Sequence, residues 1–240
     1  MALDEALAAC VRADRGVIRL YRWDPPTVSF GRNQPARSRF DMDGARARGI
    51  GFVRRPTGGR AVLHDQEVTY AAVFPKRAFP SPRVAYGSLH RGLAIGLARL
   101  GVDARVVEEG EGRVLPPDAG PCFRAPAPGE LVVVGRKVVG SAQVRIGEAI
   151  LQHGSILMGG SQEILGDLGD EAQGSDVPPV TLGEILGEAP GAEELMAAVR
   201  FGLEAHLGGE WEESDYTEDE LAEAESILPR YRSEAWTWRR

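Results

Sequence analysis

The segment ELVVVGRKVVGSAQ, residues 130–143, contains two short runs of valine on either side of a glycine. Valine is typical of strands, and Gly135-Arg136 between the runs favours a type II′ turn, because glycine suits the first central position of that turn. The segment therefore predicts a β-hairpin whose return strand opens at Lys137. Another strand, AILQHGSIL at 149–157, follows it directly.

The segment before this hairpin, residues 109–129, has a different character. It holds five prolines and four glycines in 21 residues and shows no periodicity. A structureless segment of this length inside a compact domain is usually a binding or catalytic loop. Cys122 lies within it, fifteen positions before Lys137, so a thiol is expected near an amine that would favour the nucleophilic thiolate. The sequence alone does not establish that the two side chains meet.

The numbers of lysines and arginines give a second reason to expect a functional role for Lys137. The chain has two lysines against 26 arginines, so arginine serves wherever a solvated cation is enough. A retained lysine indicates a need for an amine, which can be tuned by burial and can give up a proton, whereas arginine effectively cannot. The alternative is an ordinary surface lysine, and the neighbouring Arg136 shows that arginine is tolerated one position away.

The rest of the chain alternates helices and strands without an internal repeat. Helical patterns cover about 2–13, 41–49, 82–101, 191–207 and 217–228, and strand patterns cover 16–23, 26–30, 51–55, 67–74 and 102–107. Cys10 falls at a helical spacing and is interpreted as a buried thiol. The two cysteines, far apart and without CxxC spacing, argue against a metal site and a disulfide framework.

Length and charge narrow the class of protein. A chain of 240 residues with 43% hydrophobic content can bury one well-packed core. No apolar run long enough to span a membrane and no export leader is visible, so a cytoplasmic protein without membrane association is expected. Residues 31–60 hold eight arginines and two aspartates, while residues 161–240 hold five arginines and twenty acids. This distribution favours an acidic partner or anionic ligand near the first segment over general nucleic-acid binding, with solvated arginines as the alternative.

A second cluster, RRPTGGRAVLHD, occupies residues 54–65. Arg54 and Arg55 lead into a Gly58-Gly59 turn, where the backbone can approach a ligand closely and form a wall for an acyl or phosphate-bearing group. His64 and Asp65 could form an acid-base pair, although adjacent strand residues point to opposite faces, so a structural role is favoured. His153 in LQHGS is interpreted as lining or bracing the site.

Together, RRPTGGRAVLHDQEVTYAAVFP, ELVVVGRKVVGSAQ and AILQHGSIL resemble the biotin/lipoate protein ligase superfamily, in particular its lipoate and octanoate branch. The resemblance runs from about residue 2 to residue 160. It implies an α+β catalytic domain of the class II synthetase-like kind, with a mixed, largely antiparallel curved sheet and flanking helices. The core would be residues 1–160, and residues 161–240 would be an acidic helical extension packed on the same domain.

The resemblance also implies the site. Lys137 would be catalytic, and the Gly-Gly loop and the lysine strand would enclose an acyl pocket. The expected substrate-binding residues are Arg54, Arg55, Gly58, Gly59, Arg60, His64, Gly140, Ser141, His153 and Gly154, and no metal ligand is expected.

The branch of the superfamily can be narrowed further. Biotin ligases carry a GRGRxGR-type loop that GRNQPAR does not match, and ATP-dependent lipoate ligases usually have a third glycine where this chain has Arg60. The PCFRAP segment looks like the cysteine loop of LipM-type octanoyltransferases, which need no ATP. Cys122 would then carry the acyl group as a thioester, and no cofactor would be needed.

The partners implied are acyl carrier protein as donor and a lipoyl-domain protein as acceptor, either the glycine-cleavage H protein or an E2 subunit. Three alternatives stay open. They are an amidotransferase moving octanoate between lipoyl-domain proteins, a lipoate ligase using ATP and magnesium, and a catalytically silent protein that only binds lipoyl domains or lipoate.

Overall fold

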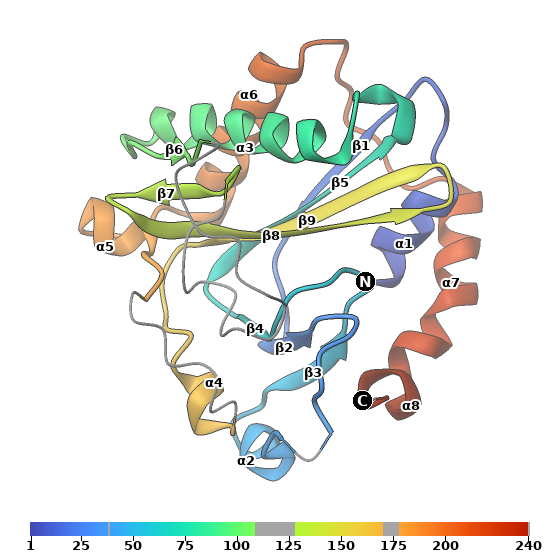
Figure 1. Ribbon diagram of the computed structural model, residues 1–240, viewed down its shortest axis with the longest axis vertical. Helices are drawn as coiled ribbons and strands as arrows, with labels where there is room; N and C mark the ends of the chain where they lie inside the picture. The colour runs from blue at the N-terminus through green and yellow to red at the C-terminus, as the bar shows by residue number, and fades with distance from the viewer. Residues whose placement is uncertain (38, 109–127, 170–177, 240) are drawn as a thin grey trace.

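The strands of the protein form two sheets, seen in a computed structural model that describes residues 1–37, 39–108, 128–169 and 178–239 (Figure 1). The larger sheet has the order β1-β5-β9-β8-β7-β6, and every neighbouring pair in it is antiparallel. Its strands are β1 (Val17–Tyr21), β5 (Glu67–Pro75), β6 (Arg105–Val106), β7 (Leu131–Val133), β8 (Arg136–Ile146) and β9 (Ala149–Leu157).

The smaller sheet has the order β3-β2-β4 and lies below the larger one in Figure 1. Strand β2 (Thr27–Phe30) is parallel to β3 (Gly51–Arg54) and antiparallel to β4 (Val62–His64). The expected α+β class with a mixed, largely antiparallel sheet is confirmed. The second sheet is not predictable from the sequence pattern, because β4 is only three residues long and offers no alternation to detect.

The hairpin of β7 and β8 is present, but its turn lies one residue earlier than expected. Val133 pairs with Arg136, so the two central residues are Val134 and Gly135, with φ of 48° and 74°. Two positive φ values are typical of a type I′ turn, so the predicted type II′ turn at Gly135-Arg136 is wrong. A β-branched residue rarely adopts this conformation, which is why the pattern pointed to the next dipeptide.

Helices cover both faces of the larger sheet. Above it in Figure 1 lie α3 (Pro82–Arg99) and α6 (Ala192–Leu207), and beside it α1 (Ala2–Ala9) packs against α7 (Glu218–Arg232). The shorter helices are α2 (Met42–Ala47), η1 (Lys76–Ala78), α4 (Ile164–Asp167), α5 (Leu182–Leu186) and α8 (Glu234–Thr237). Helix α1 ends at Ala9 and not near residue 13 as expected, and Cys10 is its C-cap. Cys10 is only half-buried, so the expectation of a buried thiol is wrong.

The main core forms between α3, α6 and the larger sheet. Leu89, Leu93 and Leu97 of α3 are buried there, each contributing about 1.5–3 kcal/mol of transfer free energy. The two helices approach closely because glycines meet at the crossing. A Cβ on Gly202 would lie 2.2 Å from the carbonyl oxygen of Gly92, so no larger residue is accommodated there.

A second, aromatic core holds the smaller sheet. The rings of Phe30, Phe52 and Trp238 lie between 5.1 and 5.6 Å from one another, so β2, β3 and the residues after α8 pack together. The buried Arg54 joins the end of β3 to the end of α8, because its Nε donates to the carbonyl oxygen of Thr237 at 2.9 Å. In the part of the chain described, no helix is long and apolar enough to cross a membrane.

Candidate active site

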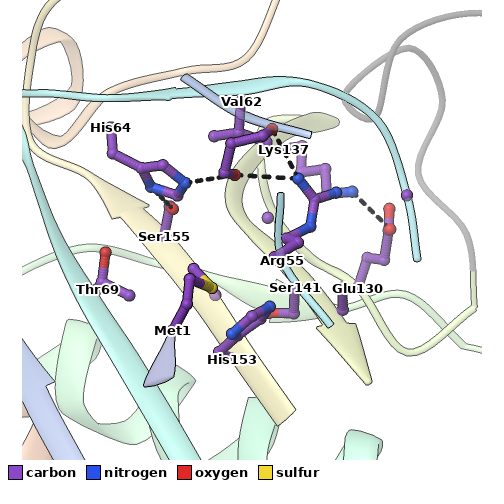
Figure 2. A pocket seen from close by; sticks show the side chains of 15 residues that line it. Met1, Arg55, Val62, His64, Thr69, Glu130, Lys137, Ser141, His153 and Ser155 are labelled. Carbon is purple, nitrogen blue, oxygen red and sulfur yellow. Dashed lines mark hydrogen bonds and ion pairs between the residues drawn. The ribbon is translucent and has the colours of Figure 1, made fainter. Parts of the chain in front are cut away.

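A cavity of about 230 Å³ lies between β8 and β9 of the larger sheet and the smaller sheet with its Gly58-Gly59 loop, and Figure 2 shows side chains that line it. The predicted site residues that line it are Arg55, Gly59, His64, Lys137, Gly140, Ser141, His153 and Gly154. Segments more than eighty residues apart in the sequence thus meet at one cavity. Cys122 lies outside the described residues.

Lys137 is buried at the wall of this cavity, with 4% of its surface exposed. Its Nζ donates to Oε1 of Glu130 at 2.5 Å, and Glu130 lines the same cavity. A buried ammonium requires a charged or polar partner, because its transfer from water is otherwise costly. Glu130 was not among the predicted site residues, and the signal that could have found it is an acidic residue directly before the strand that pairs with the lysine strand.

Arg55 is fixed by bonds to the protein. Nη1 donates to the backbone oxygen of Ser29 at 2.9 Å and to its Oγ at 3.0 Å. Nη2 donates to the carbonyl oxygens of Gly58 and Arg60 at 2.8 and 2.7 Å, and Nε donates to that of Gly58 at 3.2 Å. All five guanidinium hydrogens therefore have oxygen partners within the protein. Arg55 shapes the Gly58-Gly59 loop that forms one wall of the cavity.

Three of the predicted binding residues do not line the cavity. Arg54 is fully buried and donates to carbonyl oxygens of Gly31, Gln34 and Thr237, so it holds the loop after β2 and the residues of α8 together. Gly58 and Arg60 contribute the carbonyl oxygens that Arg55 binds. Neither Arg54 nor these two is among the residues at the cavity surface.

The Gly58-Gly59 loop approaches the loop after β2 very closely. A Cβ built on Gly31 would lie 1.8 Å from the carbonyl oxygen of Gly59, and Gly59 itself has φ of 91°. Only glycine can occupy both positions. The glycines were predicted to let the backbone approach a ligand, and part of their role is to let two backbone segments approach each other.

His64 belongs to a buried hydrogen-bond chain beside the cavity. Its Nδ1 lies 2.7 Å from Oε1 of Glu67 and its Nε2 lies 2.7 Å from Oγ of Ser29. The indole of Trp23 stacks on the imidazole at 4.3 Å, which fixes the ring plane. Asp65 is not part of this chain, and the acid facing His64 is Glu67, three residues later. The reason is that the chain turns at residues 65 and 66 to begin β5.

His153 connects the cavity with the N-terminal helix. Its Nε2 lies 2.6 Å from Oγ1 of Thr57, and its Nδ1 lies 3.6 Å from Oδ2 of Asp4. Burial lowers the pKa of His153. Burial of Asp4 acts to raise the pKa of that carboxyl, but the N-terminal ammonium, His153 and Arg19 outweigh it and hold the pKa well below its usual range. Asp4 is therefore ionised beside the ring, but at 3.6 Å it makes no hydrogen bond to Nδ1, and the bond to Thr57 is what orients the imidazole.

Gly140, Ser141 and Gly154 form the part of the cavity wall made by the paired strands β8 and β9. Ser141 Oγ lies 2.7 Å from the hydroxyl of Tyr70 and 2.8 Å from Nε2 of His90. A Cβ on Gly154 would lie 2.5 Å from Ser141 Oγ, so a glycine is needed opposite this serine. His90 and Tyr70 were not among the predicted site residues: His90 lies on helix α3 outside the quoted motifs, and Tyr70 lies inside one on strand β5, where the strand pattern alone gives it no role.

Among the described residues, no three His, Cys, Asp or Glu side chains converge in a way that could hold a metal ion. The chemistry that these residues can supply is that of a buried amine beside a carboxylate. It is set in a partly apolar cavity bounded by Val62 and Ala142 as well as the polar groups above. A cavity of this kind suits a small, partly apolar ligand.

The fold and the cavity define a catalytic domain of the lipoate-ligase class. The model of the lipoyl protein ligase A/B catalytic domain matches residues 1–202, and the chain belongs to this family. The chain is 39% identical to the octanoyltransferase LipM of Kyrpidia tusciae over 100% of this chain and 94% of that protein. It is 36% identical to the octanoyltransferase LipM of Staphylococcus aureus, with the same shares covered.

Solved structures show the same fold. A bipartite lipoate protein ligase from Thermoplasma acidophilum superposes with a TM-score of 0.79 at 23% identity, covering 99% of this chain and 89% of that one. A lipoate-protein ligase A bound with ATP superposes with a TM-score of 0.76 at 22% identity, covering 99% and 92%. The match to the family model and the identity to the LipM octanoyltransferases confirm the expected superfamily and its lipoate and octanoate branch.

Proposed function

We propose that this chain is an acyltransferase that moves an octanoyl group from acyl carrier protein to a lysine of a lipoyl-domain protein. The observation that carries the proposal is the partly apolar cavity with the buried Lys137 at its wall. It is supported by the similarity of the whole chain to octanoyltransferases named LipM.

The proposed reaction consists of two octanoyl transfers, the first to the sulfur of Cys122 and the second to the amine nitrogen of the acceptor lysine. In the first, the Cys122 thiolate attacks the carbonyl carbon of the octanoyl thioester, the old C–S bond breaks, and the thiol of the carrier leaves with a proton. In the second, the acceptor lysine amine attacks the new thioester on Cys122. An amide forms, the C–S bond breaks, and the amine proton returns the cysteine to its thiol. Lys137 would exchange protons with the leaving and attacking groups.

The donor would dock near the arginine-rich segment. Two of its eight arginines, Arg54 and Arg55, are buried and serve the fold. The exposed ones are Arg32, Arg37, Arg39, Arg46 and Arg48. An acidic carrier protein fits this surface by charge. The acceptor would be the glycine-cleavage H protein or an E2 subunit.

A ligase that activates a free carboxylate with ATP is the second candidate, supported by the superposition on a ligase bound with ATP. The contacts of Arg55 favour the transferase, since its five hydrogens already bond to protein oxygens and a nucleotide phosphate would have to displace them. No cofactor is proposed for the transferase.

Intact-mass analysis of a lipoyl-domain acceptor tests the proposal. Incubation with octanoyl-acyl carrier protein and this chain, without ATP or magnesium, should add one octanoyl group to the acceptor. Free octanoate with ATP and magnesium should add little. Efficient modification only in the second mixture would replace the transferase by the ligase.

The acyl-enzyme has its own test. Without acceptor, octanoyl-acyl carrier protein should add one hydroxylamine-labile octanoyl group to the chain. Cys122→Ser should abolish this adduct, and Cys10→Ser should leave it unchanged. An adduct on Cys10 alone would remove Cys122 from the mechanism.

A further inference from the structure

The carboxylate of Glu130 lies against the amine of Lys137 at the cavity wall (Figure 2). Oε1 and Nζ are 2.5 Å apart, and the two side chains are only 13% and 3% exposed. An ion pair so shielded from water is much stronger than one on the surface, because the local dielectric constant is lower. The contact with Glu130 therefore restricts the positions that the Lys137 ammonium can occupy.

The position of Glu130 follows from the hairpin. Lys137 is the Cα partner of Val132, and Glu130 comes two residues before Val132 along the chain. Glu130 thus directly precedes β7, whose pairing with β8 shifts register between Leu131 and Val132, and the contact of its carboxylate with Nζ shows that the two side chains meet on one side of the hairpin.

The backbone that carries Glu130 is held from two sides. The Gly129 amide donates to the carbonyl oxygen of Val107 at 2.7 Å, and the Val107 amide donates to that of Glu130 at 2.8 Å. His90 of α3 donates from Nδ1 to the Gly129 carbonyl oxygen at 2.5 Å. The carboxylate thus extends from a fixed point.

The backbone of Lys137 is fixed as well, but its side chain is not fixed by the strand alone. The Lys137 carbonyl oxygen accepts from the Val180 amide at 3.0 Å, while the four-carbon stem leaves the amine many rotamers. Glu130 restricts this freedom by accepting one of the three ammonium hydrogens.

We propose that Glu130 is a positioning residue for Lys137, which holds the ammonium at the cavity wall where the acyl carbonyl would lie. This inference rests on the proposed octanoyl transfer for its kinetic part. Its structural part, the buried ion pair, is independent of the reaction.

Selective nitrogen-15 labelling of lysine gives a direct readout, since Lys76 and Lys137 are the two lysines of the chain. The pair Lys76–Glu148 is a matched control, with Nζ and Oε1 2.6 Å apart but the side chains 52% and 77% exposed. The Lys137 ammonium should give a slowly exchanging NMR signal that Glu130→Gln removes. Glu148→Gln should leave that signal unchanged.

Kinetics supplies the second readout. Glu130→Gln should lower kcat for octanoyl transfer roughly 10- to 100-fold, the loss typical of a misplaced catalytic group, with KM changed less than about twofold. Glu130→Asp keeps the charge and should recover part of kcat, whereas Glu148→Gln should behave as the wild type.

Wild-type kcat in Glu130→Gln, or a Lys137 ammonium signal that survives this substitution, would overturn the proposal. If Glu130→Gln does not fold, Glu130→Asp is judged by the same two measurements against the wild type. If the wild-type chain transfers no octanoyl group, the proposed function is wrong. The NMR comparison would still decide whether Glu130 positions the Lys137 amine.

Discussion

Nε2 of His90 and Oγ of Ser141 lie 2.8 Å apart, so a buried imidazole on helix α3 is bonded to the wall of the cavity. On its other side His90 faces the carbonyl oxygen of Gly129, which can only accept. Nδ1 therefore carries the hydrogen, and Nε2 accepts from the Ser141 hydroxyl. Burial lowers the pKa of His90 to about 4, so the ring is neutral at neutral pH.

This burial makes stability depend on pH. Between about pH 6.5 and 4 the unfolded chain takes up a proton at His90 while the folded chain does not, so stability falls as the pH falls, by up to about 1.4 kcal/mol per unit. His90→Asn should be less stable at neutral pH by about 1–3 kcal/mol. Its deficit should shrink toward pH 4 in urea unfolding, and a deficit that is the same at every pH would contradict the neutral buried ring.

Lys137→Arg should lose at least about 100-fold in kcat/KM for octanoyl transfer, although the positive charge is kept. Arginine cannot give up its proton, and its larger head does not fit a site where Nζ lies 2.5 Å from the carboxylate of Glu130. Lys76→Arg is the control and should retain activity, since Lys76 is exposed. Near-normal turnover of Lys137→Arg would reduce this residue to an electrostatic role.

Gly154→Ala should damage the cavity wall. The added Cβ would lie 2.6 Å from the carbonyl oxygen of Gly140 and 2.5 Å from Ser141 Oγ, so β8 and β9 would have to separate. A loss of about 1–3 kcal/mol in unfolding free energy is expected, together with weaker octanoyl transfer. In Gly87→Ala the nearest atom is the Arg91 side chain at 3.7 Å, so this helix substitution should stabilise by about 0.5–1 kcal/mol. Equal stability of the two variants would contradict the close approach at Gly154.

Val134→Asn should raise the melting temperature. Val134 is 95% exposed and has φ of 48°, a conformation that a β-branched side chain disfavours and that asparagine adopts readily before glycine in a type I′ turn. The expected gain is about 0.5–1 kcal/mol, measured by thermal unfolding, with octanoyl transfer unchanged. A lower melting temperature would mean that the exposed valine stabilises the hairpin.

Much of the fold could be predicted from local patterns. The helix expected at 82–101 is present at Pro82–Arg99, and the strand expected at 67–74 at Glu67–Pro75, because each carries its own periodicity. The short strand β4 could not be found this way, since three residues have no period and its pairing with β2 is set by packing.

The site was predictable where a motif carries it. Lys137 and His153 were named from the sequence, and both line the cavity. Ser29 and His90 were not named, because strand pairing and helix packing between distant segments bring them to the site. Glu130 and Glu67 lie inside the quoted motifs, but the sequence does not show which of the motif side chains face the cavity. Arg54 and Arg55 show the converse case. The motif predicted that they contact a ligand, whereas their guanidinium groups donate to carbonyl oxygens of the protein.

Arg54 has a consequence for the order of events during synthesis. Its Nε donates to the carbonyl oxygens of Trp236 and Thr237, residues that leave the ribosome long after Arg54 does. Before those residues are made, the guanidinium has its acceptors near β2, such as Gly31 and Gln34, but lacks the two carbonyl oxygens that Nε binds, so its burial costs more free energy. The smaller sheet is therefore expected to close fully only after residues 236 and 237 have left the ribosome, which ties completion of the cavity to a segment synthesised 182 residues after Arg54.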